Sequence, residues 1–174
     1  MILKELLERS EYTLVQGSED VEISTLVHDS RKIEKGSVFV CISGAVSDGT
    51  YIYRAGCRKR CSSCHCRKDV EAPEGLTVIK VKDTRYALAM TSAAYFGYPA
   101  EKLKVIGITG TKGKTTTTYM VKSILEEVGI RVGLIGTIEA IIGDKSIPAN
   151  NTTPESYTIQ KYFAEMVEAG CECV

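Results

Sequence analysis

The sequence of 174 residues lacks a net charge, a long apolar run and any internal repeat. Its 22 acidic and 22 basic residues balance, so no overall field favours binding to nucleic acid or to an anionic membrane surface. No apolar stretch approaches the ~20 residues of a membrane-spanning helix. The N-terminal stretch MILKELLERSEYTL predicts an amphipathic helix and has no small-residue cleavage site, unlike a signal peptide. We therefore expect a cytoplasmic protein, in which clustered cysteines indicate metal binding or catalysis before disulfides.

The order of the predicted elements indicates an α/β protein with two domains. After the first helix, residues 21–44 contain two strand-like stretches separated by the charged turn DSRKIEKGS, and GLTVIKV is another short β-rich run. The stretch DTRYALAMTSAAYFGYP predicts a helix that is capped by Asp83 and ended by its Gly-Tyr-Pro sequence. We place an N-terminal domain at residues 1–99 and the beginning of a second domain at residues 100–174.

The second domain opens with a predicted strand–helix–strand unit. KLKVIGITG is rich in Val and Ile, like a buried strand, and TKGKTTTTYMVKSILEEVGI turns into a helix that stops near Gly129. RVGLIGTIEA is the second strand, so a parallel sheet is expected to begin near Leu103. Another helix follows Pro154, and a further strand starts at CECV. A doubly wound sheet needs more strands than these, and we expect the chain to be truncated.

The segment GITGTKGKTTTT, between a strand and a helix, is the strongest functional signal. Gly110 and Gly113 let the backbone approach an anion, and backbone N–H groups at the helix N-terminus can surround phosphate oxygens. Lys114 is expected to reach the terminal phosphates, and the hydroxyl of Thr115 to bind Mg²⁺. The general P-loop pattern G-x-x-x-x-G-K-S/T is not met, because Ile108 stands at its first glycine. We interpret the segment as a phosphate loop. The alternative is a Gly/Thr-rich turn that only connects a strand to a helix.

This loop resembles that of the Mur ligase family and its folylpolyglutamate synthetase relatives, T-G-T-N/K-G-K-T-S/T, in which Lys112 is one of two usual choices. HDSRKIEKGSVFVCISG followed by SDG resembles the uridine-nucleotide-binding domain of one member, and NNTTPES resembles its N-T-T-P/G loop. That member adds the third amino acid to the peptidoglycan stem peptide. Alone, the DSR triplet could be an Asx turn and NTTP a helix entry with a Thr cap. It is the ordered set of motifs that carries the resemblance.

The resemblance implies a small N-terminal α/β domain that binds the UDP-linked substrate, followed by the start of a parallel-sheet ATP-binding domain. The implied reaction is ATP- and Mg²⁺-dependent ligation in peptidoglycan synthesis. ATP phosphorylates the D-glutamate carboxylate of UDP-N-acetylmuramoyl-L-alanyl-D-glutamate, and a diamino acid, expected to be meso-diaminopimelate, attacks the acyl phosphate to give an amide. Positive charge and N–H donors on the migrating phosphoryl group are what this chemistry needs.

Site residues follow by position from the resemblance. Ser30 would contact the uracil-nucleotide end of the substrate, and Lys114 would be catalytic. The implied ATP-binding residues are Gly110, Thr111, Lys112, Gly113, Lys114, Thr115 and Thr116. The residues implied for the muramoyl-peptide part are Asn151, Thr152 and Thr153. The partners would be these substrates, without nucleic acid or membrane, for a monomeric protein.

Part of the family's machinery would lie beyond Val174: a second metal-binding carboxylate, a carbamylated lysine and the domain that selects the amino acid. The chain alone is therefore expected not to ligate. The alternatives are another Mur ligase or folylpolyglutamate-synthetase-like ligase, an unrelated P-loop kinase or GTPase, and a small zinc-binding module that would explain only the cysteines.

Residues 57–66, CRKRCSSCHC, interrupt the resemblance at about residues 50–67. As a zinc site they are awkward, because Cys64, His65 and Cys66 are consecutive whereas structural zinc normally uses two separated pairs of ligands. A basic patch is a second interpretation, but no aromatic residues interleave usefully.

A third interpretation is a slipped reading frame. When suitable codons for residues 50–68 are shifted by one base, they encode HIYTERAAERGAAAVIVE for positions 50–67 and rejoin KDV in register. The shifted peptide has a helix, a glycine stop and a buried strand, as an α/β domain requires after Asp48-Gly49. We therefore predict a one-base insertion near codon 50 and a compensating loss near codon 67. With CRKRCSSCHC, the first domain is expected to lose a helix and a core strand and to pack poorly there.

Overall fold

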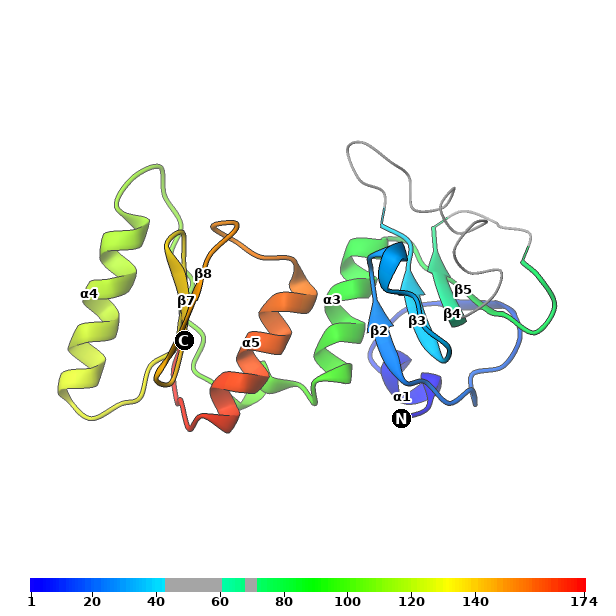
Figure 1. Cartoon of the computed structure of the whole chain (residues 1–174), viewed down its shortest axis with the longest axis horizontal. Coiled ribbons are helices and arrows are strands. Elements are labelled where there is room, and N and C mark those ends of the chain that lie inside the picture. The colour runs from blue at the N-terminus through cyan, green and yellow to red at the C-terminus, as the bar shows by residue number, and fades with distance from the viewer. Residues whose placement is uncertain (43–60, 68–71) are drawn as a thin grey trace. The chain divides into compact units, whose positions relative to one another are not determined.

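The structure is a computed structural model that describes residues 1–42, 61–67 and 72–174. The chain divides into two compact units, Met1–Tyr95 and Phe96–Val174, where the sequence placed the division between residues 99 and 100. Each unit combines helices with β-structure, and the fold class is α/β as predicted (Figure 1).

The described part of the first unit is built on a five-stranded sheet in the order β1-β5-β4-β3-β2. The contacts β2–β3, β3–β4 and β4–β5 are parallel, and β1 joins the edge at β5 in the antiparallel direction. The strands are β1 (Thr13–Gln16), β2 (Thr25–Val27), β3 (Ser37–Val40), β4 (Cys61–Cys66) and β5 (Thr77–Lys80).

The helices of the first unit are α1 (Leu3–Leu7), the short 3₁₀ helix η1 (Ser30–Lys32) and α3 (Thr84–Tyr95). Asp83 caps α3 as predicted, because its Oδ1 accepts hydrogen bonds from the backbone N–H groups of Arg85 (2.8 Å) and Tyr86 (3.2 Å). The apolar face of α1 is buried and α1 packs against α3, so the amphipathic N-terminal stretch is part of this unit's core.

The expectation that CRKRCSSCHC would cost the first domain a core strand is wrong. Residues Cys61–Cys66 form β4, the middle strand of the sheet, with parallel neighbours on both sides. Backbone hydrogen bonding does not depend on side-chain polarity, so a polar segment can occupy the strand position that the neighbouring β3 and β5 leave between them. The helix that the shifted peptide would form falls on residues 50–60, which lie outside the described residues.

The second unit contains α4 (Lys114–Glu127), α5 (Ser156–Glu168) and the 3₁₀ helix η3 (Pro99–Lys102). Of the parallel sheet that was expected to begin near Leu103, the described residues show only isolated parallel bridges of Cys173 to Lys104 on one side and to Val132 on the other. The segment KLKVIGITG forms no strand, and its Val105 and Ile106 are exposed, so the prediction of a buried strand there is wrong. The N–H of Ile106 donates to the carbonyl of Val174 (2.8 Å) and that of Gly133 to the carbonyl of Cys173 (2.8 Å). The CECV segment therefore lies between the segments that contain Lys104 and Val132.

A β-hairpin in the second unit was missed by the sequence analysis. In the described residues, β6 (Leu134–Ile135), β7 (Glu139–Ile142) and β8 (Lys145–Pro148) form an antiparallel sheet in that order. The turn after β7 contains Gly143 at φ 57°, a conformation that glycine adopts without strain. The hairpin lies between α4 and α5 (Figure 1). In the described parts of the chain, no helix has the length and apolarity that a membrane crossing requires.

Candidate nucleotide-binding site

The phosphate loop joins the strand-like segment after Leu103 to the N-terminus of α4. Gly113 is the N-cap of this helix at φ 80°, and Gly110 has φ 148°. Both values lie in the region that L side chains rarely adopt, and an added Cβ on Gly113 would meet no atom within 4 Å. Glycine is therefore needed at Gly113 for its backbone conformation and not for lack of space.

The start of α4 is suited to an anion. Gly113 makes no side-chain cap, and the first turn contains no acidic residue, so its backbone N–H groups and the positive end of the helix dipole meet no competing carboxylate there. Of the predicted ATP-binding residues, Lys114 and Thr115 are half-buried and the others are exposed. The Nζ of Lys114 donates to the carbonyl of Gly110 at 2.7 Å, which holds the ammonium group over the loop.

The predicted loop Asn151–Thr153 lies in the same unit, between β8 and α5, and is exposed. The Oγ1 of Thr137 donates to the Oγ1 of Thr152 at 3.3 Å. Thr152 and Thr153 also line a pocket of about 200 Å³ together with Thr118 of α4. The structure therefore brings this loop to the helix that follows the phosphate loop, although the two are more than 30 residues apart in sequence.

The pocket itself is mainly apolar, and sequence reasoning did not identify it. Ile108 and Thr118, which flank the phosphate loop, belong to its lining, and the loop residues between them do not. The apolar lining comes from the strand-like segments and both helices, and includes Ile106, Val121, Leu125, Leu134, Ile135 and Phe163. The apolar residues of KLKVIGITG and RVGLIGTIEA that line the pocket were the sequence signal that could have indicated it.

A polar contact ties α4 to the hairpin. The carboxylate of Glu139 accepts hydrogen bonds from the hydroxyl of Ser146 and from that of Tyr119, the latter at 2.5 Å. These bonds, that of Ser146 first, lower the pKa of Glu139, and the bond to Glu139 raises the pKa of Tyr119. Tyr119 lies one turn after Thr115, so this contact positions the first turns of the phosphate-loop helix.

Ser30 lies in the other unit, as the first residue of η1, and is half-buried. The preceding Asp29 caps this turn by accepting from the N–H of Arg31 at 3.0 Å, and its carboxylate pairs with the Arg31 guanidinium at 2.7 Å. These hydrogen bonds hold the pKa of Asp29 well below its ordinary range. The DSR triplet thus has the geometry of an Asx-capped turn, which presents Ser30 at its start.

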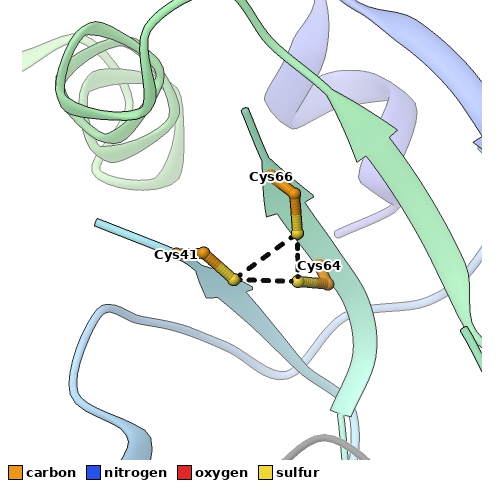
Figure 2. A group of neighbouring side chains, drawn as sticks. All are labelled: Cys41, Cys64 and Cys66. Atoms are coloured by element: carbon orange, nitrogen blue, oxygen red, sulfur yellow. Dashed lines mark hydrogen bonds between the residues drawn. The ribbon is translucent and has the colours of Figure 1, made fainter. Parts of the chain in front are cut away.

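Three cysteine thiols meet in the first unit (Figure 2). Cys41, directly after β3, lies with its sulfur 3.1 Å from that of Cys64 and 3.5 Å from that of Cys66, and the two β4 sulfurs are 3.1 Å apart. All three side chains are buried. Sequence reasoning considered only CRKRCSSCHC and missed Cys41; its place at the end of a predicted strand was the available signal.

Comparison with known proteins shows what the chain is similar to. The Mur ligase middle domain matches residues 108–174, a range that begins just before the phosphate loop. Over its whole length the chain is 47% identical to the UDP-N-acetylmuramoyl-L-alanyl-D-glutamate--2,6-diaminopimelate ligase of Clostridium perfringens, of which it covers 36%. Both comparisons point to the Mur ligase family. The protein of the same name from Bacillus licheniformis is 43% identical over 90% of the chain, which covers 32% of that relative.

The chain therefore spans about a third of the length of the curated relatives it matches. A solved UDP-N-acetylmuramoyl-L-alanyl-D-glutamate--2,6-diaminopimelate ligase has a TM-score of 0.74 at 16% identity, over 99% of this chain and 34% of that one. MurF from Acinetobacter baumannii has a TM-score of 0.57 at 23% identity, over 94% of this chain and 32% of that one. At these identities the two structures support the fold alone.

Proposed function

We propose that this chain is the substrate- and phosphate-binding part of an ATP-dependent ligase of peptidoglycan synthesis. The ligase joins meso-diaminopimelate to the D-glutamate carboxylate of UDP-N-acetylmuramoyl-L-alanyl-D-glutamate. The observation that carries the proposal is the start of α4, where two glycines at positive φ and the ammonium of Lys114 surround an uncapped helix N-terminus. The UDP-linked dipeptide and 2,6-diaminopimelate are the compounds in the names of the 47% and 43% identical relatives, and the meso form is the expectation from the sequence.

The residues of the loop fit the phosphates of ATP. The backbone N–H groups of Gly113 to Thr116 would bind phosphate oxygens, and Lys114 would exchange its bond to the Gly110 carbonyl for one to the terminal phosphates. Thr115, in the first turn of α4, would hold Mg²⁺ through its hydroxyl. That ion, when bound, supplies positive charge on the phosphoryl group that moves to the carboxylate.

The other predicted residues are assigned to the UDP-linked substrate. Ser30 would bind the uracil-nucleotide end, and Asn151, Thr152 and Thr153 the muramoyl-peptide part. The position of Thr152 and Thr153 in the same pocket as Thr118 supports this, because the acceptor carboxylate has to come close to the phosphate bound at α4. The enzyme is proposed to act as a cytoplasmic monomer.

The test uses a completed ligase, in which this chain is joined at Val174 to the remaining part of the Clostridium perfringens relative. ATP, Mg²⁺, the UDP-linked dipeptide and meso-diaminopimelate are supplied, and amide product and ADP are measured. We expect one ADP per amide formed, with no product when GTP replaces ATP. Nucleotide hydrolysis that is independent of the UDP-linked dipeptide would instead support an unrelated P-loop kinase or GTPase.

The choice of diaminopimelate is tested in the same enzyme with a lysine competitor. Because the part that selects the amino acid would then come from the relative, the competition is repeated with the intact native ligase. Incorporation of lysine in preference to meso-diaminopimelate by the native enzyme would contradict this part of the proposal while leaving the ligase function in place.

A further inference from the structure

The middle strand of the first unit has an unusual composition for its position. β4 is parallel to both neighbours, and its residues from Ser63 to Cys66 are buried. A strand covered on both faces in a parallel sheet ordinarily reads as a continuous run of aliphatic residues. The neighbours β3 and β5 read SVFV and TVIK, whereas β4 reads CSSCHC.

Two side chains of β4 bury polar atoms that make no hydrogen bond with the described residues. The Oγ of Ser63 and both ring nitrogens of His65 are buried and have no hydrogen-bond partner among the described residues. Burial lowers the pKa of His65 to about 4, so its ring is neutral at pH 7 and still carries one donor and one acceptor. Buried polar groups in native proteins are nearly always paired, so two such side chains in one strand conflict with the fold around them.

The opposite face of β4 carries Cys64 and Cys66, whose thiols meet that of Cys41 (Figure 2). A tetrahedral zinc ion with Zn–S bonds of about 2.3 Å would hold its sulfurs about 3.8 Å apart, further than the 3.1–3.5 Å found here. Within the described residues, no fourth metal ligand joins the three thiols. They pack with Phe39, Leu76 and Val78 in an apolar cluster, so they act as small hydrophobic side chains.

We propose that the gene's codons 50–67 are displaced by one base between two compensating slips, and that the native β4 strand is AAAVIV. In the shifted peptide HIYTERAAERGAAAVIVE, these six residues fall on positions 61–66, the bounds of β4. The shift makes Ser63→Ala and His65→Ile, which removes both sets of unpaired polar atoms. It also makes Cys64→Val and Cys66→Val, which keeps that face apolar.

The strand bounds support the shift independently of the codons from which it was derived. A shift of the reading frame generally produces an unrelated peptide, with no reason to have apolar residues at the positions that the fold buries. Here it places a glycine at position 60, directly before the first residue of β4, and aliphatic side chains at the four buried positions Ser63 to Cys66. The inference concerns these residues alone and holds or fails separately from the ligase function.

Tryptic peptide mass spectrometry of the protein purified from its native organism, with sequencing of the gene, tests the inference. The shifted frame yields the peptide GAAAVIVEK, covering positions 60–68, because cleavage follows the arginine before the glycine. Detection of this peptide is the expected result. Detection of CSSCHCR, with all three thiols alkylated and an intact gene sequence encoding it, would overturn the inference.

A stability comparison tests the structural reasoning on which the inference rests. The 174-residue chain and a variant carrying the shifted peptide at positions 50–67 are unfolded by heat, and the variant is expected to melt higher by about 5 °C or more. The single variant His65→Ile should raise the Tm, whereas Thr91→Val should lower it, because the buried hydroxyl of Thr91 donates to the carbonyl of Ala87 at 2.7 Å. A lower Tm for His65→Ile, or stoichiometric zinc whose removal unfolds the CSSCHC form, would contradict the inference.

Discussion

The ammonium group of Lys114 donates a hydrogen bond to the carbonyl of Gly110, 2.7 Å away, across the turn that opens α4. The side chain of the first helical residue thus lies over the backbone that would surround a phosphate. This arrangement places a positive charge and the helix N-terminus on the same side of the loop, as binding of a nucleotide's terminal phosphates requires.

Replacing Lys114 should remove most of the ligase activity. In the completed ligase, Lys114→Ala is expected to lower kcat by about 10²–10³-fold, because a charge that stabilises the migrating phosphoryl group is lost. Lys161→Ala is the matched control: Lys161 is also a helical lysine of this unit and forms an ion pair with Glu165, 3.7 Å away, on α5. Equal kcat values for the two variants would show that Lys114 has no role in phosphoryl transfer.

Substitutions of the two glycines at the ends of α4 should distinguish an effect on stability from an effect on nucleotide binding. Gly113 and Gly129 have φ values of 80° and 85°, and neither has an atom within 4 Å of an added Cβ. Gly113→Ala and Gly129→Ala are therefore expected to destabilise the unit to a similar degree, about 1 kcal/mol each, through backbone strain. Only Gly113→Ala should raise the KM for ATP in the completed ligase. A similar rise in KM for Gly129→Ala would show that the strain acts through the whole helix.

The ion pair at the DSR turn should make stability depend on pH. The folded-state pKa of Asp29 is depressed by its hydrogen bonds to Arg31, so its contribution is fully present above the ordinary aspartate pKa of about 3.9. It is lost only as the pH falls from there through the folded-state pKa. The Tm difference between the 174-residue chain and Asp29→Asn should thus be constant from pH 5 to pH 7 and shrink below about pH 4.

Arg31→Met provides the control for that profile. It removes the guanidinium and retains a long side chain, so it should reproduce the pH dependence of Asp29→Asn, and the double variant should add little. A Tm difference that stays unchanged down to pH 2 would show that the pair does not shift the titration of Asp29.

The 174-residue chain by itself should not form amide. Mur ligase chemistry as proposed here needs groups that bind the incoming amino acid, and none of the predicted site residues has that role. With ATP, Mg²⁺, the UDP-linked dipeptide and meso-diaminopimelate, no product is expected from this chain under conditions in which the completed ligase is active. Product formed by the chain alone, after removal of any contaminating ligase, would contradict this prediction.

Local signals in the sequence were sufficient for the starts of α3 and α4 and for the strands β2, β3 and β5. Gly113 and Lys114 are adjacent residues whose role depends on a turn and a helix start, and Asp83 caps the helix that begins at the next residue. Such features are encoded within a few neighbouring residues, because caps, turns and side-chain periodicity involve only short-range contacts.

Contacts between distant segments were decided by the tertiary structure. The meeting of Cys41 with Cys64, the bond from Thr137 to Thr152, and the parallel bridges of Cys173 to Lys104 and Val132 all depend on which segments pair and in which register. The sequence pattern marks each segment as a strand or a loop, but the same pattern is compatible with several strand orders. Sheet order and register are set by the packing of whole segments against one another, so the pocket between α4 and the Asn151–Thr153 loop emerged only with the fold.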